Sequence, residues 1–142
     1  MTTEASLTPK NVPVGLALRE AAIAGAVAAL INAIIYYAVR FFVIQGPLLV
    51  ETPQGDILGI VPVLIASILP ALIAGLIYWA LDRFLANPNP AFLGVSAVVF
   101  IVMIFGPLNA TNDPAAGWTL EIMHGVVAVP VIMAMLSLKG KL

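Results

Sequence analysis

Long apolar stretches alternate with short polar segments along the whole chain. Four stretches rich in Ala, Ile, Leu, Val and aromatic residues cover about residues 16–44, 60–85, 91–105 and 114–138. A helix of about 20 mainly apolar residues crosses the hydrocarbon core of a bilayer, and the shortest stretch would only just cross it. The pattern therefore predicts an all-α fold, an integral membrane four-helix bundle in which residues 1–142 form a single transmembrane domain.

Two of the predicted helices begin with a capping residue that is followed by proline. Asn89 precedes Pro90, and Asp113 precedes Pro114. Asn and Asp side chains accept hydrogen bonds from the first free N–H groups of a helix, and proline has no N–H that would need a partner there. The dipeptide Gly106-Pro107 is expected to end the third helix, because proline disfavours continuation of the backbone hydrogen bonds.

Pro70 lies inside the second predicted helix. Its ring removes the hydrogen bond to the carbonyl of Ala66, so we expect a kink at this position. Membrane helices tolerate such a kink where neighbouring helices satisfy the freed carbonyl.

The distribution of positive charge predicts how the bundle is oriented. If both termini are cytoplasmic, five basic residues lie on the cytoplasmic side, as the positive-inside rule favours: Lys10, Arg19, Arg83, Lys139 and Lys141. Arg40 then lies near the outer face. Residues 45–59, which contain Glu51, Asp56 and the turn signal Thr52-Pro53-Gln54-Gly55, are expected to form a short extracytoplasmic hairpin-like loop between the first two helices.

The composition restricts the environment and the partners. The chain is 62% hydrophobic and 9% charged, with a mean hydropathy of +1.10, whereas a soluble domain carries about 25% charged residues. The lipid bilayer is therefore the expected partner. Six basic and seven acidic residues nearly cancel, which argues against nucleic acid as a partner. The chain has no cysteine, which excludes thiol chemistry and Cys-based metal sites, and we expect no cofactor.

A few polar residues fall at membrane depth, where a charge costs about 2.5 to 3.5 kcal/mol at the bilayer centre. Asn32, Tyr36 and Arg40 follow one another at four-residue steps on the first helix, and Glu121 and His124 share a face of the fourth. Antiparallel helices place Arg40 and Glu121 at similar depth, so we expect an ion pair that offsets the desolvation of both. Together the five residues would form one outward-opening polar pocket.

Each of these residues also has a simpler structural explanation. Arg40 can extend to the outer surface without a partner, with Glu121 near the positive end of its own helix dipole. His124 can be a neutral imidazole that bonds across helices, and Asn32 can be an amide that links helices. One His and one Glu make only half of a zinc site, so we expect no metal.

Small residues recur every four positions along the first two helices. They are Ala21, Gly25, Ala29 and Ala33 on the first helix and Ser67, Ala71 and Gly75 on the second. Such faces allow helix backbones to approach closely. Packing within the bundle is the default explanation, and dimerisation is the alternative.

Three short segments resemble an uncharacterised bacterial family of small four-helix membrane proteins, the domain-of-unknown-function family 6069. The segments are Ala28-Ala29-Leu30-Ile31-Asn32, Leu69-Pro70-Ala71 and Met123-His124-Gly125-Val126-Val127. The resemblance implies four helices in a bacterial plasma membrane and no established activity.

The sequence contains no serine nucleophile motif, phosphate-binding loop or carboxylate pair, so we do not expect an enzyme. The leading hypothesis is a non-enzymatic accessory or structural subunit of a membrane assembly or a homo-oligomer. The alternative is binding or transport of a small lipophilic or anionic molecule, in which Arg40 meets an anion and His124 makes binding pH-dependent. An intramembrane enzyme with Glu121 and His124 as acid and base would lack a nucleophile or metal.

Overall fold

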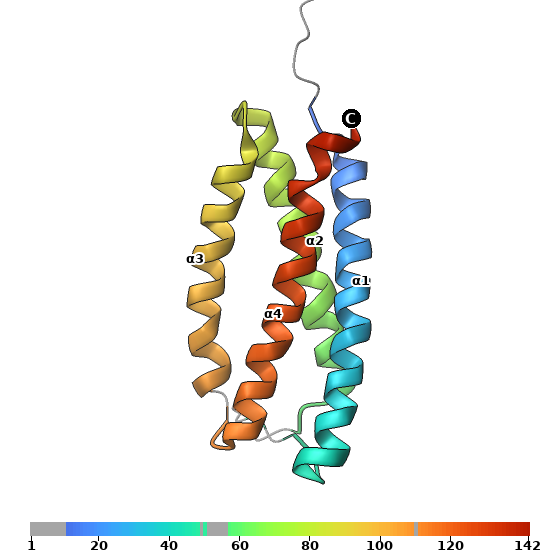
Figure 1. Cartoon of the computed structure of the whole chain (residues 1–142), viewed down its shortest axis with the longest axis vertical. Helices are drawn as coiled ribbons and strands as arrows, with labels where there is room; N and C mark the ends of the chain where they lie inside the picture. The colour runs from blue at the N-terminus through green and yellow to red at the C-terminus, as the bar shows by residue number, and fades with distance from the viewer. Residues whose placement is uncertain (1–10, 49, 51–56, 110) are drawn as a thin grey trace, which may run out of the picture.

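The computed structural model describes residues 11–48, 50, 57–109 and 111–142 as a helical bundle (Figure 1). Its long helices are α1 (Val14–Ala38), α2 (Ile60–Phe84), α3 (Pro88–Asn109) and α4 (Pro114–Leu136); the π-helix η1 (Val39–Ile44) continues α1, and the 3-10 helix η2 (Leu138–Lys141) follows α4. Consecutive long helices run in opposite directions. We call the end where α1 begins and α4 ends the terminal end, and the opposite end the far end (Figure 1).

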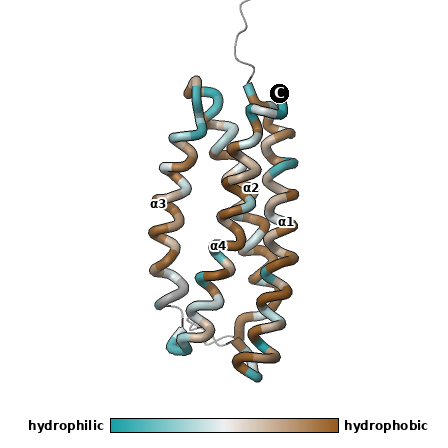
Figure 2. The backbone as a smooth tube through the Cα atoms, viewed as in Figure 1, coloured by the Kyte–Doolittle hydropathy of each residue, from teal (hydrophilic) through white to brown (hydrophobic). Residues whose placement is uncertain are grey.

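In the described part of the chain, four helices are long and apolar enough to cross a membrane. Apolar residues dominate the helix middles, and hydrophilic residues gather toward the two ends (Figure 2). Large side chains such as Leu30, Val98 and Met133 are more than half exposed on the outer surface. A continuous apolar surface of this kind is unfavourable in water and favourable in lipid.

The first helix covers nearly the predicted range, but its last turns are wider than an α-helix. α1 and η1 together run from Val14 to Ile44. Gln45 then adopts a left-handed conformation with φ 54°, and the N–H of Gly46 donates to the carbonyl of Arg40 at 3.2 Å. The left-handed residue turns the chain back and satisfies a free carbonyl at the end of the helix.

α3 begins earlier than predicted. The prediction placed the cap at Asn89, but the helix begins at Pro88, and the Asn87 side chain accepts a hydrogen bond from the N–H of Asn89 at 3.3 Å. The two consecutive Asn-Pro pairs offer two possible starts. The Asn89 side chain instead accepts a hydrogen bond from the Tyr78 hydroxyl at 2.6 Å, which ties the start of α3 to α2.

α3 also ends later than predicted. It continues through Gly106-Pro107 to Asn109, so it is a 22-residue helix and not one that barely crosses the bilayer. A proline in the last turns of a helix removes a single hydrogen bond, which is not enough to end it there. The start of α4 matches the prediction: Asp113 accepts a hydrogen bond from the N–H of Ala115 at 2.9 Å, followed by Pro114 as the first helical residue.

Pro70 and Pro130 lie well inside continuous helices. α2 is helical on both sides of Pro70, and α4 on both sides of Pro130, which the sequence analysis did not consider. The kink expected at Pro70 remains a prediction. In the predicted hairpin-like loop, the N–H of Leu58 donates to the carbonyl of Leu48 at 2.9 Å, whereas the turn at residues 52–55 lies outside the described residues, as do Glu51 and Asp56.

The small-residue faces bring α1 and α2 into direct backbone contact. A Cβ atom on Gly25 would lie 2.9 Å from the Cβ of Ala71, and one on Gly75 would lie 2.7 Å from the Cβ of Ala21. Six of the seven predicted packing residues are buried, including Ala29 and Ser67, and only Ala33 is half-buried. The small-residue faces of α1 and α2 therefore pack against each other inside the bundle.

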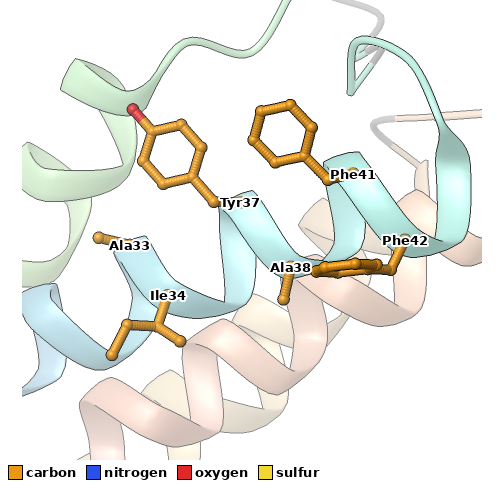
Figure 3. A pocket seen from close by; sticks show the side chains of 6 residues that line it. All are labelled: Ala33, Ile34, Tyr37, Ala38, Phe41 and Phe42. Atoms are coloured by element: carbon orange, nitrogen blue, oxygen red, sulfur yellow. The ribbon is translucent and has the colours of Figure 1, made fainter.

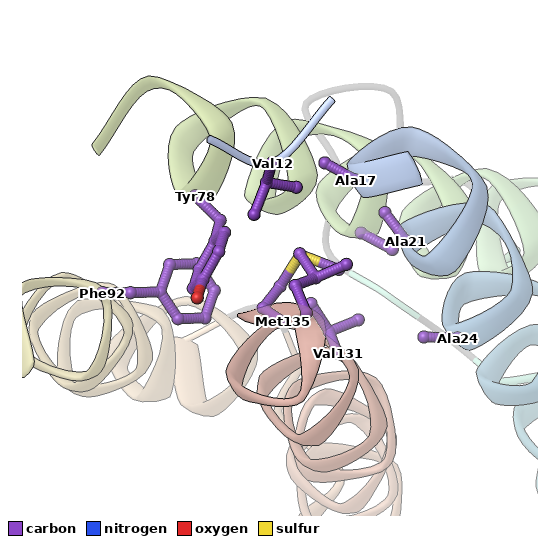
Figure 4. Packing of buried hydrophobic residues seen from close by; sticks show 10 residues of the cluster. Val12, Ala17, Ala21, Ala24, Tyr78, Phe92, Val131 and Met135 are labelled. Carbon is purple, nitrogen blue, oxygen red and sulfur yellow. The ribbon is translucent and has the colours of Figure 1, made fainter. Parts of the chain in front are cut away.

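Two groups of buried apolar side chains fill the bundle. The group at the terminal end includes Val12, Ala21, Tyr78, Phe92 and Met135, which converge from the N-terminal segment and all four helices (Figure 4). The group at the far end consists of Tyr36, Leu48, Val63, Ala116 and Met123. Among the described side chains, α3 contributes Phe92 to the first group and none to the second.

Candidate functional site

Asn32 forms a buried polar link between three helices. Its Nδ2 atom donates to the Ser67 hydroxyl on α2 at 3.0 Å and to the carbonyl of Met123 on α4 at 3.1 Å. The Ser67 hydroxyl in turn donates to the carbonyl of Val63, one turn back in its own helix, at 2.8 Å. Asn32 is 2% exposed, and its Oδ1 atom is buried with no hydrogen-bond donor in the described chain. This geometry is that of an amide linking helices.

Tyr36 and Arg40 continue this polar line toward the far end. The Tyr36 hydroxyl donates to the carbonyl of Leu58 at 2.9 Å, and Nη1 of Arg40 donates to the same hydroxyl at 3.3 Å. The predicted stripe on the first helix is therefore a connected set of hydrogen bonds. It ends in the Arg40 guanidinium, whose one hydrogen bond within the described ranges is that to Tyr36 and which has five N–H donors.

The predicted ion pair between Arg40 and Glu121 is not formed. Among the described residues, the two ion pairs lie at the terminal end, and Arg40 bonds to Tyr36. Glu121 precedes Met123 by two residues, a rotation of about 200° around α4, so it points away from the face that meets Asn32. Sequence spacing did not determine the side of α4 on which Glu121 lies, and its predicted depth stays a prediction.

His124 also stays outside the Asn32 network. Its Nδ1 atom lies 2.7 Å from the carbonyl of Leu120, one turn back in α4. Because a carbonyl only accepts, this bond places the ring proton on Nδ1. In the described part of the chain, His124 thus bonds to its own helix, and neither it nor Glu121 shares a hydrogen bond with Asn32, Tyr36 or Arg40.

The sequence analysis missed a charged cluster at the terminal end. Asp82 has a fully buried side chain; its Oδ2 accepts from the N–H of Val12 at 2.6 Å, and its Oδ1 lies 2.5 Å from Nζ of Lys139. That lysine is what satisfies Oδ1, which has no other hydrogen-bond donor in the described chain. Nearby, Lys141 pairs with Glu20 at 2.6 Å. One sequence signal could have indicated these ion pairs: Glu20 and Asp82 are acidic residues at the end of the helices where most basic residues lie.

Two surface hollows lie at the far end of α1. The first, of about 400 Å³, is an apolar groove that includes Ala33, Tyr37, Phe41 and Phe42 (Figure 3). The second, of about 460 Å³, contains Arg40, Phe41, Gln45, Gly46 and Pro47. Of the predicted polar cluster, only Arg40 lines either hollow. Within the described ranges, no three His, Asp or Glu side chains gather as metal ligands would.

Replacing Asn32 by alanine is expected to lower the free energy of unfolding by about 1 kcal/mol, because two hydrogen bonds between helices are lost. Unfolding in mixed micelles of sodium dodecyl sulfate, followed by circular dichroism, measures the change. Ser67→Ala is the matched control and should have a smaller effect, since Asn32 keeps its bond to Met123. An equal loss from the two variants would contradict the proposed role of Asn32.

The fold and this polar network define a multi-pass helical membrane protein. The chain belongs to a family of unknown function, DUF6069, whose model matches residues 13–140. The match includes the Asn32, Pro70 and His124 segments on which the resemblance was based. No curated protein and no solved structure is significantly similar to the chain.

Proposed function

We propose that this protein is a non-enzymatic structural subunit that associates in the membrane through α3. The observation that carries the proposal is how little of α3 is covered. In the apolar 18-residue stretch of α3, only 6% of the residues are buried, against 22% in the corresponding stretch of each of the other three helices. Pro88 and Phe92, both near the terminal end, are its buried side chains among those described.

The rest of α3 presents a continuous surface suited to another protein helix. Gly25 and Gly75 are explained by close contact between α1 and α2, but a Cβ on Gly94 of α3 would meet nothing within 4 Å. Glycine destabilises a helix by about 1 kcal/mol relative to alanine in water, and membrane helices use it where backbones meet. A second copy of this chain is the occupant we propose, because most oligomers are closed and symmetric.

The proposal includes an orientation. The terminal end carries Arg19, Arg83, Lys139 and Lys141, and the positive-inside rule then places both termini in the cytoplasm of a bacterial cell, with the protein in its plasma membrane. Lys10 lies outside the described residues. Glu20 and Asp82 pair with the two lysines, whereas Arg19 and Arg83 form no ion pair among the described residues.

Disulfide cross-linking tests the association. The chain has no cysteine, so a single Val98→Cys substitution on α3 reports only contacts at that position. Leu30→Cys, at 66% exposure and near the middle of α1, matches Val98 at 62%. In native membranes treated with a mild oxidant, we expect the Val98→Cys dimer to exceed the Leu30→Cys dimer at least five-fold.

Two outcomes would contradict the homo-oligomer. Equal dimer yields at the two positions would show random collision in the membrane. A Val98→Cys adduct with a different protein would replace the homo-oligomer by a mixed assembly, in which the chain is an accessory subunit.

A further inference from the structure

We propose that the far end of α1 binds one phospholipid, whose phosphate meets Arg40 and whose acyl chain lies along the apolar groove. This inference does not depend on association through α3, because α1 and η1 have their helix contacts with α2 and α4. It refines the alternative function, binding of a lipophilic or anionic molecule, to an amphipathic ligand.

The two hollows at this site share one lining residue and have different chemistry. Phe41 lines both of them. The groove on one side of Phe41 is built from Ala33, Ile34, Tyr37, Ala38 and Phe42, and the rings of Tyr37 and Phe41 stack at 6.2 Å (Figure 3). The second hollow is lined by Arg40 and Gln45 together with Phe41. An apolar groove next to a hollow lined by a cationic side chain complements a lipid tail joined to a phosphate.

Arg40 is available and held in position. It has no acidic partner among the described residues, and Tyr36 accepts one of its hydrogen bonds. Tyr36 is itself fixed by its bond to the carbonyl of Leu58. A guanidinium offers five N–H donors in a planar fork that matches a phosphate, so several remain for a ligand.

The site lies at the depth of the lipid headgroups. The span Val14–Ile44 has 31 residues, which at about 1.5 Å per residue is about 45 Å long, longer than the roughly 30 Å hydrocarbon core. Figure 1 shows η1 extending beyond the far end of α3. The last turns of this helix therefore reach the headgroup region, where arginine meets lipid phosphates and aromatic rings are favoured.

Native mass spectrometry of the full chain, purified in a mild detergent, tests the proposal. The probes are palmitoyl-oleoyl-phosphatidylglycerol and dioleoylglycerol, which has similar acyl chains and no phosphate. We expect one phosphatidylglycerol to bind at least ten-fold more tightly than dioleoylglycerol. Arg40→Gln should reduce this preference about ten-fold, and Arg40→Lys should reduce it less, because lysine keeps the charge but loses the planar fork.

Two further variants separate the site from general effects. Arg19→Gln, on the same helix at the terminal end, should leave the affinity unchanged. Ala38→Trp fills the apolar groove on the exposed side of α1 without removing Arg40, and should weaken binding about ten-fold. Unchanged binding by Arg40→Gln, an equal loss in Arg19→Gln, or equal affinity for dioleoylglycerol would overturn the proposal. A dimer whose interface covers Arg40 and the apolar groove, and so excludes lipid from them, would also overturn it.

Discussion

Replacing Gly75 by alanine is expected to lower the free energy of unfolding by about 2 to 3 kcal/mol, the upper part of the range for overpacking. The added methyl group would lie 2.7 Å from the Cβ of Ala21 and 3.1 Å from the carbonyl oxygen of Ala17. Both contacts are closer than van der Waals distance, and neither atom belongs to a flexible side chain. Relief therefore requires α1 and α2 to separate.

Gly125→Ala is the matched control for this prediction. Gly125 also lies inside a long helix, but a Cβ there would meet nothing within 4 Å. This variant should be neutral or slightly stabilising, because alanine has the better helix propensity. Unfolding in mixed micelles, monitored by circular dichroism, measures both. Equal stability of the Gly75→Ala and Gly125→Ala proteins would show that the α1–α2 contact is looser than described.

The second large effect is expected for Asp82→Ala, which should lower the free energy of unfolding by about 3 kcal/mol. The substitution leaves the buried N–H of Val12 without an acceptor, a loss of about 1 to 3 kcal/mol. It also removes the carboxylate that pairs with Lys139 at 2.5 Å. Breaking a fully buried ion pair costs about 3 to 5 kcal/mol, but Lys139 is 29% exposed, so solvent recovers part of that loss.

Glu20→Ala provides the comparison for Asp82. It also removes a carboxylate from an ion pair at the terminal end, but its partner Lys141 is 42% exposed, and exposed pairs contribute about 0 to 1 kcal/mol. Asp82→Asn should fall between the two, since the amide oxygen can still accept from Val12. If Asp82→Ala were no more destabilising than Glu20→Ala under the same micelle titration, the Asp82 cluster would not hold the terminal end together.

Helix number and helix packing could be predicted from the sequence because they depend on local patterns. Apolar runs of sufficient length define the spans, and the four-residue recurrence of small residues marked the packing faces of the first two helices, which the structure brings together at Gly25 and Gly75. The first and last residues of α3 could not be predicted as well. The two Asn-Pro pairs are equivalent as local signals for the start of the helix. Tyr78, on the preceding helix, bonds to the side chain of Asn89, and the local sequence does not show this bond.

The candidate site was predicted in part. The Asn32, Tyr36 and Arg40 line follows from the periodicity of a single helix. To predict whether Arg40 pairs with Glu121, one must know which side of α4 faces α1. Depth in the membrane does not determine this. The contact of Asp82 with Lys139 joins residues 57 positions apart, and no local pattern marks such a pair.

The attachment of α3 has a consequence for motion in the bundle. Phe92 packs edge-on against Tyr78 with ring centroids 5.3 Å apart, and Tyr78 holds Asn89, so the first turns of α3 are anchored. α1 and α2 are in close contact at Gly25 and Gly75. We therefore expect any displacement of α3 relative to this pair to be a pivot about its first turns, with an amplitude that grows toward Asn109. A subunit contact on α3 would be rigid near Phe92 and adaptable at the other end of the helix.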